Sequence, residues 1–146
     1  MNPLVTQLES VSDSEIEEFN GQVTEFFDAV SQQQGPAFYK HLSKDLFVYS
    51  ILPFDGGKQI TDFDEYLRFH EWWMAQKDRT WHYKIDRVLF ITPVVATVTI
   101  TANYFYPQNG KQVARVITIS NCFKLKEKIW YLVTNQNTLV SETIGI

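Results

Sequence analysis

The second half of the chain carries the pattern that most restricts the possible folds. From residue 94 to residue 106, the segment "VVATVTITANYFY" alternates between apolar and polar side chains. Strict alternation predicts a strand with one buried and one exposed face. Further strands are predicted over about residues 80–91, 111–124 and 129–140. Turn signals at "TP", "PQNG" and "KE" separate neighbouring strands, so the second half is predicted to be an antiparallel meander.

The first half has helical periodicity instead. Ser12 and Glu15 have capping-box spacing, and apolar residues follow at every third or fourth position. Helices are predicted over about residues 13–33, 36–42 and 62–77, and "LFVYSIL" predicts a strand between the last two. Helices followed by a meander predict an α+β fold, with residues 1–11 as a loose lead-in and 12–146 as one domain.

Composition narrows the class of protein. At 146 residues, with 45% hydrophobic and 15% aromatic residues, the chain predicts a single folded domain with a sizeable core. The net charge of −4 and the scattered basic residues argue against nucleic acid as a partner. No apolar run is typical of a membrane span or a secretion signal. The single cysteine, Cys122, excludes an internal disulfide, so a cytoplasmic location is expected.

Strand pairing predicts which side chains share the inner face of the meander. The apolar row from Val94 to Tyr104 should face the helices. A four-residue loop over Pro107–Gly110 would pair Ala102 with Arg115. A two- or four-residue loop around Lys126-Glu127 would extend the row across the last two strands. That extended inner row is predicted to contain Asn121, Arg115, Trp130, Leu132, Thr134, Gln136 and Thr138.

One end of this inner row gathers polar groups, namely Tyr104, Arg115, Thr134, Gln136 and Thr138. An unpartnered buried hydroxyl or amide costs about 1–3 kcal/mol, and a guanidinium costs more. A few convergent polar groups in an apolar concavity are typical of small-molecule sites. The row therefore predicts a pocket. The alternative is that these groups satisfy one another or lie in water at an open sheet end.

The order of elements over about residues 12–142 resembles the nuclear transport factor 2-like, or SnoaL-like, superfamily. The last hairpin, "RVITISNCFKLKEKIWYLVTNQNT", is similar to the pattern of an arginine, a hydroxyl residue, phenylalanine and tryptophan that its members often carry. The resemblance implies three helices packed on a strongly curved, mostly antiparallel sheet, an α+β cone with an internal pocket. It also implies homodimers paired through the outer sheet face.

The sequence departs from the catalytic patterns of this superfamily. Many members end the last strand with His-x-His-x-Ser, where this chain has "TNQNT". Ketosteroid-isomerase-like members place an aspartate near Ser50, and Asp55 is the nearest substitute. Of the two histidines in scytalone-dehydratase-like members, His82 matches the first and Tyr104 replaces the second. The resemblance to the association domain of calcium/calmodulin-dependent kinase II suggests that Arg115 binds an anion.

Two histidines are candidate general bases. His82 matches the superfamily position, but its strand parity places it on the outer face, as a structural or surface residue. His70 follows Phe63, Tyr66 and Leu67 at helical spacing, on the buried side of its helix. It is either a hydrogen-bonded core histidine or a pocket acid/base.

Other chemistry finds little support in the sequence. The histidines are too isolated to predict a metal site, and no phosphate loop or dinucleotide fingerprint occurs, so no cofactor is expected. Cys122 is expected on the outer face. That face is predicted to be rich in threonine and poor in charge, which is typical either of an interface or of a solvated sheet.

Three hypotheses follow. The first is a dimeric protein that binds a small, partly apolar molecule with a polar or anionic group. Trp73 and Trp130 would help to form the walls, and Arg115, Gln136, Thr134, Thr138 and Asn121 would orient the ligand. The second is a cofactor-free isomerase, dehydratase or cyclase with His82 or His70 as the base and Tyr104 as a hydrogen-bond donor. The third is a scaffold with a vestigial cavity.

Overall fold

The computed structural model describes residues 4–54 and 56–145, within which three helices lie against one seven-stranded sheet. The helices are α1 (Asp13–Gln32), α2 (Gly35–Tyr39) and α3 (Phe63–Ala75). The strands are β1 (Leu4–Gln7), β2 (Tyr49–Ile51), β3 (Gln59–Ile60), β4 (Thr80–Thr92), β5 (Val95–Gln108), β6 (Lys111–Lys126) and β7 (Ile129–Gly145). The predicted α+β class is confirmed.

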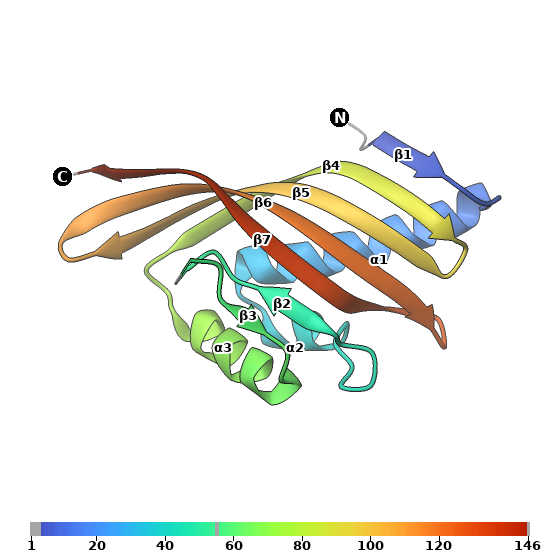
Figure 1. Cartoon of the computed structure of the whole chain (residues 1–146), viewed down its shortest axis with the longest axis horizontal. Coiled ribbons are helices and arrows are strands. Elements are labelled where there is room, and N and C mark those ends of the chain that lie inside the picture. Colours follow the sequence, from blue (N-terminus) through green and yellow to red (C-terminus); the bar gives the residue numbers. More distant parts are fainter. Residues whose placement is uncertain (1–3, 55, 146) are drawn as a thin grey trace.

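The sheet is long, strongly curved and covered on one side by the helices (Figure 1). Its strand order is β1-β4-β5-β6-β7-β2-β3, and the central four strands form the predicted antiparallel meander. The two flanking pairs, β1 with β4 and β2 with β7, are parallel. The far ends of β5, β6 and β7 extend past the helices (Figure 1). The helices therefore cover only part of the concave face.

The capping signals act as predicted at α1. The Ser12 side chain accepts from the Glu15 backbone, and the Glu15 carboxylate accepts from the Ser12 N–H at 3.0 Å. Satisfying these end groups fixes where the helix begins. The lead-in differs from the prediction of a loose segment, because Leu4–Gln7 pairs in parallel with β4.

The turn between β5 and β6 is shorter than predicted. Gln108 pairs with Lys111, so the loop consists of Asn109 and Gly110, with φ values of 53° and 75°. Two consecutive residues at positive φ suit a tight hairpin, and an Asn-Gly pair favours one. Arg115 therefore pairs with Tyr104, not with Ala102. The slip is two residues, so Arg115 keeps its predicted face.

The pairing of β6 with β7 contains a bulge that the sequence analysis missed. Phe123 pairs with Leu132, but Cys122 pairs with Thr134, so Val133 has no partner of its own. One extra residue exchanges the two faces of the strand beyond that point. The predicted inner row is therefore wrong beyond Leu132. A second register shift lies between Val116 and Ile117.

A cluster of aromatic rings fills the core where α1 packs against the sheet near the β6–β7 turn. Phe19 has no exposed surface, and its ring centroid lies 4.7 Å from that of Trp130 and 5.0 Å from that of Phe90. Phe123 packs edge-on against the same ring. We call this cluster of Phe19, Phe90, Phe123 and Trp130 the aromatic end of the sheet.

Candidate ligand-binding pocket

A pocket of about 370 Å³ lies on the same sheet face, away from the aromatic end. This volume is in the range of about 300–1,000 Å³ that small-molecule sites occupy. Its floor consists of buried aromatic side chains, including Phe26, Phe27, Phe38 and Trp81. Exposed residues at its edge, Trp72 and Gln108, mark the opening to solvent. We call this region the pocket end of the sheet.

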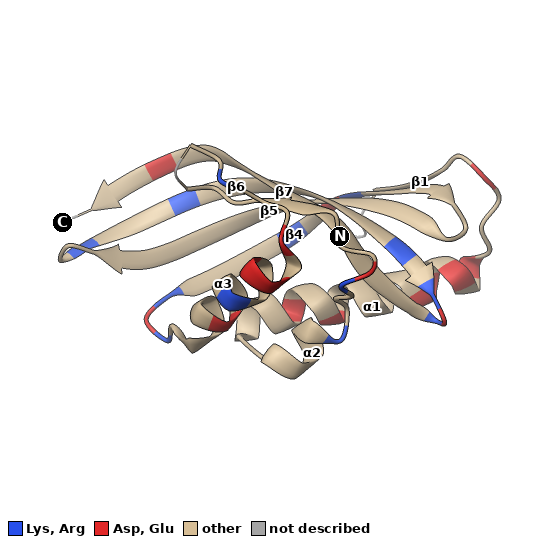
Figure 2. Cartoon of the chain, turned by 60° about the horizontal axis from the view of Figure 1, so that its bottom comes forward, with Lys and Arg blue, Asp and Glu red and all other residues tan. Residues whose placement is uncertain are grey.

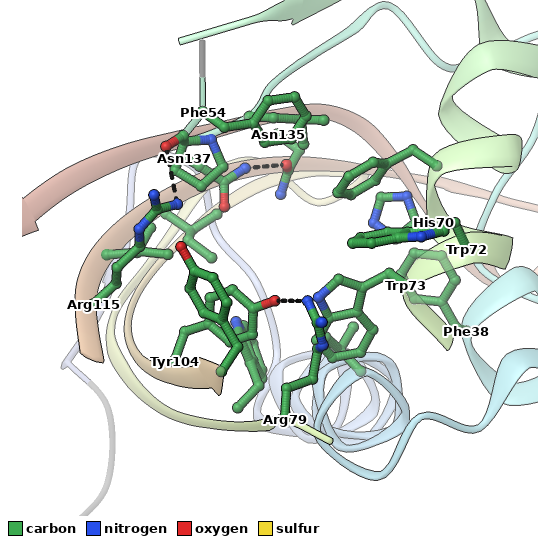
Figure 3. Close-up of a pocket in the computed structure, with 18 of the residues that line it drawn as sticks. Phe38, Phe54, His70, Trp72, Trp73, Arg79, Tyr104, Arg115, Asn135 and Asn137 are labelled. Carbon is green, nitrogen blue, oxygen red and sulfur yellow. Dashed lines mark hydrogen bonds between the residues drawn. The ribbon is translucent and has the colours of Figure 1, made fainter. Parts of the chain in front are cut away.

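Arg79, just before β4, lies at this opening between aromatic rings. Its guanidinium carbon lies 5.2 Å from the centre of the Trp72 ring and 5.6 Å from that of Tyr106. Its Nη1 donates to the Tyr104 hydroxyl at 2.6 Å (Figure 3). Its Nε donates to Asp78 at 3.0 Å. Burial opposes the positive charge, but the hydrogen bonds to Tyr104 and Asp78 outweigh this cost and raise the pKa of Arg79.

Arg115, on β6, places a second guanidinium in the pocket wall. Its Nε donates to the Glu142 carboxylate at 2.6 Å, and its Nη1 makes a long contact of 3.4 Å with the Pro53 carbonyl. Its side chain is 18% exposed, and it also lies over the Tyr106 ring at 5.4 Å. The described residues form no other polar contact with the guanidinium, so most of its donors are available to a ligand.

Tyr104 is a neutral hydrogen-bond donor at physiological pH. Burial raises the pKa of its phenol, and the donor from Arg79 only partly opposes this effect. Arg79 donates to the phenolic oxygen, so the Tyr104 hydrogen is free to donate elsewhere. Among the described residues no base lies within hydrogen-bond distance of this hydroxyl.

His70, on α3, lines the pocket between aromatic rings. Its ring stacks on Phe38 with centroids 4.8 Å apart, and it lies 4.2 Å from Tyr66. Burial lowers the pKa of His70 to about 4, so the ring is neutral at pH 7. Nδ1 lies 3.1 Å from the Tyr66 carbonyl, which only accepts, so Nδ1 carries the hydrogen and Nε2 carries the lone pair. This Nε2 has no hydrogen-bond partner among the described residues.

A chain of amides forms the opposite wall. Asn135 donates to Asn121 at 2.7 Å and accepts from Ser50 at 2.9 Å. Asn137 donates to Asn135 at 2.7 Å (Figure 3). It also donates to the Ile51 carbonyl at 2.8 Å. Asn135 and Asn137 line the pocket, whereas Asn121 and Ser50 are buried behind them. These contacts join β2, β6 and β7.

The bulge in β7 corrects three predicted site residues. Thr134, Gln136 and Thr138 pair with Cys122, Ser120 and Thr118, which belong to the outer face, and none of the three lines the pocket. Asn135 and Asn137 line the pocket in place of these three residues. The signal for this exchange is absent from the sequence, since both rows of "TNQNT" are equally polar.

The remaining predicted residues differ in where the structure places them. Trp73, Tyr104, His70 and Arg115 line the pocket. Trp130 belongs to the aromatic end, away from the pocket, and Asn121 supports Asn135 from behind. His82 is exposed and pairs with Asn103, so strand parity predicted its place and the superfamily resemblance did not. Asp55 lies outside the described residues.

Sequence analysis missed Arg79. The residue stands in the short connection "QKDRT" between α3 and β4, where an arginine is indistinguishable from a solvated loop residue. A possible signal is its position between the tryptophan pair of α3 and the first residues of β4, because a charge next to aromatic residues often packs on them.

No helix in residues 4–54 or 56–145 has the length and apolarity needed to cross a bilayer. Within the same residues, no three histidine, cysteine, aspartate or glutamate side chains gather as metal ligands would.

Comparison with known proteins places the fold. No protein-family model and no curated protein matches the sequence. Solved structures do match. An NTF2-like family protein from Streptomyces avermitilis, provisionally named a dehydratase, has a TM-score of 0.72 at 19% identity, covering 89% of this chain and 99% of its own. A hexachlorocyclohexane dehydrochlorinase has a TM-score of 0.73 at 8% identity, covering 92% and 94%.

The association domain of C. elegans CaMKII has a TM-score of 0.63 at 18% identity, covering 87% of this chain and 99% of that one. The protein has the NTF2-like fold. This confirms the structural part of the predicted resemblance. At these identities the likeness extends to the fold, and the pocket residues must be interpreted from their own chemistry.

Proposed function

We propose that the protein binds a small molecule with a flat apolar body and an anionic group. The observation that carries this proposal is the pair of guanidinium groups in a pocket otherwise lined by aromatic, aliphatic and amide side chains and the neutral His70. No carboxylate occurs among the described lining residues. An anion near Arg79 and Arg115 would gain charge-assisted hydrogen bonds, and the aromatic floor would cover the apolar body.

The two arginines can bind an anionic group even though each already pairs with a carboxylate. Asp78 and Glu142 both contact the Nε edge of their arginine. The Nη1/Nη2 edge of a guanidinium can also form a two-point contact with a carboxylate. Both arginines also pack on aromatic rings, which holds their planes in place before a ligand arrives.

Isothermal titration calorimetry with 2-naphthoate and its neutral analogue 2-naphthamide tests the proposal. We expect 2-naphthoate to bind in the micromolar range and the amide at least tenfold more weakly. Arg115→Ala should weaken binding of 2-naphthoate by roughly 10- to 100-fold, since a hydrogen bond to a charged group contributes about 1.5–3 kcal/mol.

The matched control is Arg87→Ala, which removes the same charge from an exposed site on β4 outside the pocket. The affinity of this variant for 2-naphthoate should match that of the wild-type protein. Absence of 2-naphthoate binding up to millimolar concentration would contradict the proposal, as would equal affinities for the acid and the amide.

A second candidate function is proton transfer on a carbonyl compound. The neutral His70 presents the Nε2 lone pair, and Tyr104 has a free hydroxyl hydrogen for a developing enolate. The similarity to a hexachlorocyclohexane dehydrochlorinase and to a provisionally named dehydratase is compatible with such chemistry. Exchange of the α-hydrogens of 2-tetralone in D₂O, followed by NMR, should slow to the background rate in His70→Phe. Equal rates in the two proteins would exclude His70 as the base.

Self-association through the outer sheet face accompanies either function. Thr97, Thr99 and Thr118 lie on this face, and long stretches of the strands carry no charge (Figure 2). Lys84, Asp86 and Arg87 of β4 lie at one side of this face. The uncharged surface over the middle of β5 and β6 suits a partner copy. The similarity to the CaMKII association domain supports the same idea. Sedimentation equilibrium should give a dimer for the wild-type protein and a monomer for Thr99→Lys. A monomeric wild type would contradict it.

A further inference from the structure

The amide chain in the pocket wall has a fixed direction, which starts at a main-chain carbonyl. Asn121 is 2% exposed, and its Nδ2 lies 3.2 Å from the Val98 carbonyl. A carbonyl only accepts, so the amide group of Asn121 must face it with its nitrogen. Its oxygen is therefore turned toward Asn135.

The next two amides are oriented by the first. Asn135 must present its nitrogen to the Asn121 oxygen at 2.7 Å, which leaves the Asn135 oxygen for Ser50 and Asn137. Asn137 must present its nitrogen in turn, and the Ile51 carbonyl, 2.8 Å away, demands the same. Two main-chain carbonyls thus fix both ends of the chain.

As a result, Asn137 offers only an acceptor to the pocket. Both hydrogens of its Nδ2 are used, one by Asn135 and one by Ile51. Its Oδ1 has no hydrogen-bond partner among the described residues. Within these residues every fully buried side-chain nitrogen or oxygen has a partner, so the Asn137 oxygen must be accessible to solvent. Asn137 and Arg115 lie on the same side of the pocket (Figure 3).

This arrangement is selective. A free asparagine can turn its amide to offer either a donor or an acceptor, and so tolerates many ligands. Turning Asn137 here would place its oxygen against the Ile51 carbonyl and the Asn135 oxygen, and would break two hydrogen bonds. A ligand that approaches with another acceptor is therefore disfavoured, and one that approaches with a hydroxyl or N–H is favoured.

We propose that Asn137 is a specificity-determining residue that selects ligands with a hydrogen-bond donor in addition to their anionic group. Resting on the proposed function, the inference narrows the ligand class to hydroxylated or amino-substituted aromatic acids. The arginines hold the anion, the aromatic floor holds the ring, and Asn137 accepts from the substituent.

The experiment compares 2-naphthoate with its monohydroxy isomers and with the methoxy analogue of the best isomer. Calorimetry with the wild-type protein should find one hydroxy isomer that binds about tenfold more tightly than 2-naphthoate, the effect of one neutral hydrogen bond. Its methoxy analogue, which cannot donate, should lose that gain. This arm needs no mutant protein.

The second arm uses Asn137→Leu with Gln136→Leu as its control. Both change an amide to leucine in β7, but Gln136 is exposed on the other face. Asn137→Leu should abolish the gain, so that the hydroxy isomer and 2-naphthoate bind to this variant with equal affinity. Gln136→Leu should keep the gain.

The failures of the two proposals differ. If 2-naphthoate binds in an Arg115-dependent way but no hydroxy isomer gains, or the methoxy analogue keeps the gain, the role of Asn137 is refuted and the anion-binding function stands. A gain that survives in Asn137→Leu refutes that role too. If neither 2-naphthoate nor any isomer binds, the proposed function itself fails.

Discussion

The aromatic end and the pocket end lie on the same face of one sheet, but they are stabilised in different ways. At the aromatic end, α1 packs directly on the strands, and Phe19 and Phe90 have no exposed surface. At the pocket end, Tyr104 and Arg115 come from the same strands, β5 and β6, yet they surround a cavity. Their polar atoms are held by partners within the wall, namely Arg79 for Tyr104 and Glu142 for Arg115.

Curvature of the sheet, more than side-chain polarity, creates the pocket. Register shifts between Ile85 and Arg87, between Val116 and Ile117, and between Cys122 and Phe123 interrupt the central strands. Bulges bend and twist a strand locally, so a straight helix cannot follow the sheet along its whole length. The helices meet the sheet at the aromatic end and leave a space at the pocket end.

The largest expected effect is on the stability of the aromatic end. Phe19→Ala should lower the free energy of unfolding by about 3–5 kcal/mol, because it removes a ring enclosed by Phe90, Phe123 and Trp130. Urea denaturation followed by tryptophan fluorescence measures this loss.

Tyr104→Phe is the matched change at the pocket end, since it removes one hydroxyl from an open wall. It should cost less than about 1 kcal/mol. Equal costs for the two substitutions would mean that the pocket end is as tightly packed as the aromatic end, and the comparison would fail.

A smaller effect tests the bulge in β7. Asn135→Ala should destabilise the protein by about 1–3 kcal/mol, because it leaves the side-chain oxygen of the buried Asn121 without a donor and the Ser50 hydroxyl without an acceptor. Gln136→Ala, one residue along on the exposed face, should change stability by less than about 0.5 kcal/mol. Thermal denaturation of both variants checks this. The reverse order would restore the register predicted from sequence.

The smallest effect concerns acid. The pKa of His70 is about 4 in the folded protein, below the ordinary value near 6.5. Its contribution to stability is therefore complete above pH 6.5 and is lost as the pH falls toward 4. When the pH falls from 6.5 to 5, the free energy of unfolding of the wild-type protein should decrease by about 1–2 kcal/mol more than that of His70→Phe.

The exposed His82 provides the control, because His82→Ala should lose stability with acid as the wild type does. Urea denaturation of the three proteins across this pH range separates the two histidines. Parallel curves for the wild type and His70→Phe would mean that His70 takes up a proton as readily when folded as when unfolded.

Much of the fold could be predicted from sequence, because its signals are local. The capping box of α1 and the alternation of β5 are set by neighbours a few residues away. Arg115 was placed on the correct face even with the wrong loop length, since an error of two residues preserves strand parity.

The site was less predictable because it depends on how distant segments meet. Nothing in "LVTNQNT" indicates that Val133 is the extra residue of a bulge, and no local pattern brings Arg79 to Tyr104 across 25 positions of sequence. The superfamily resemblance pointed to His82, whereas the histidine in the pocket is His70.

The three helices, the four meander strands and the apolar row of β5 follow from the sequence alone, because hydrophobic period and capping act over one or two turns of chain. Which polar side chains reach the pocket depends on the tertiary structure. A single unpaired residue in β7 turns Asn135 and Asn137 inward and Gln136 outward. A bulge leaves one residue of the strand unpaired wherever it occurs, so neighbouring positions lose similar hydrogen bonds. The packing of the curved sheet therefore selects the position of the bulge.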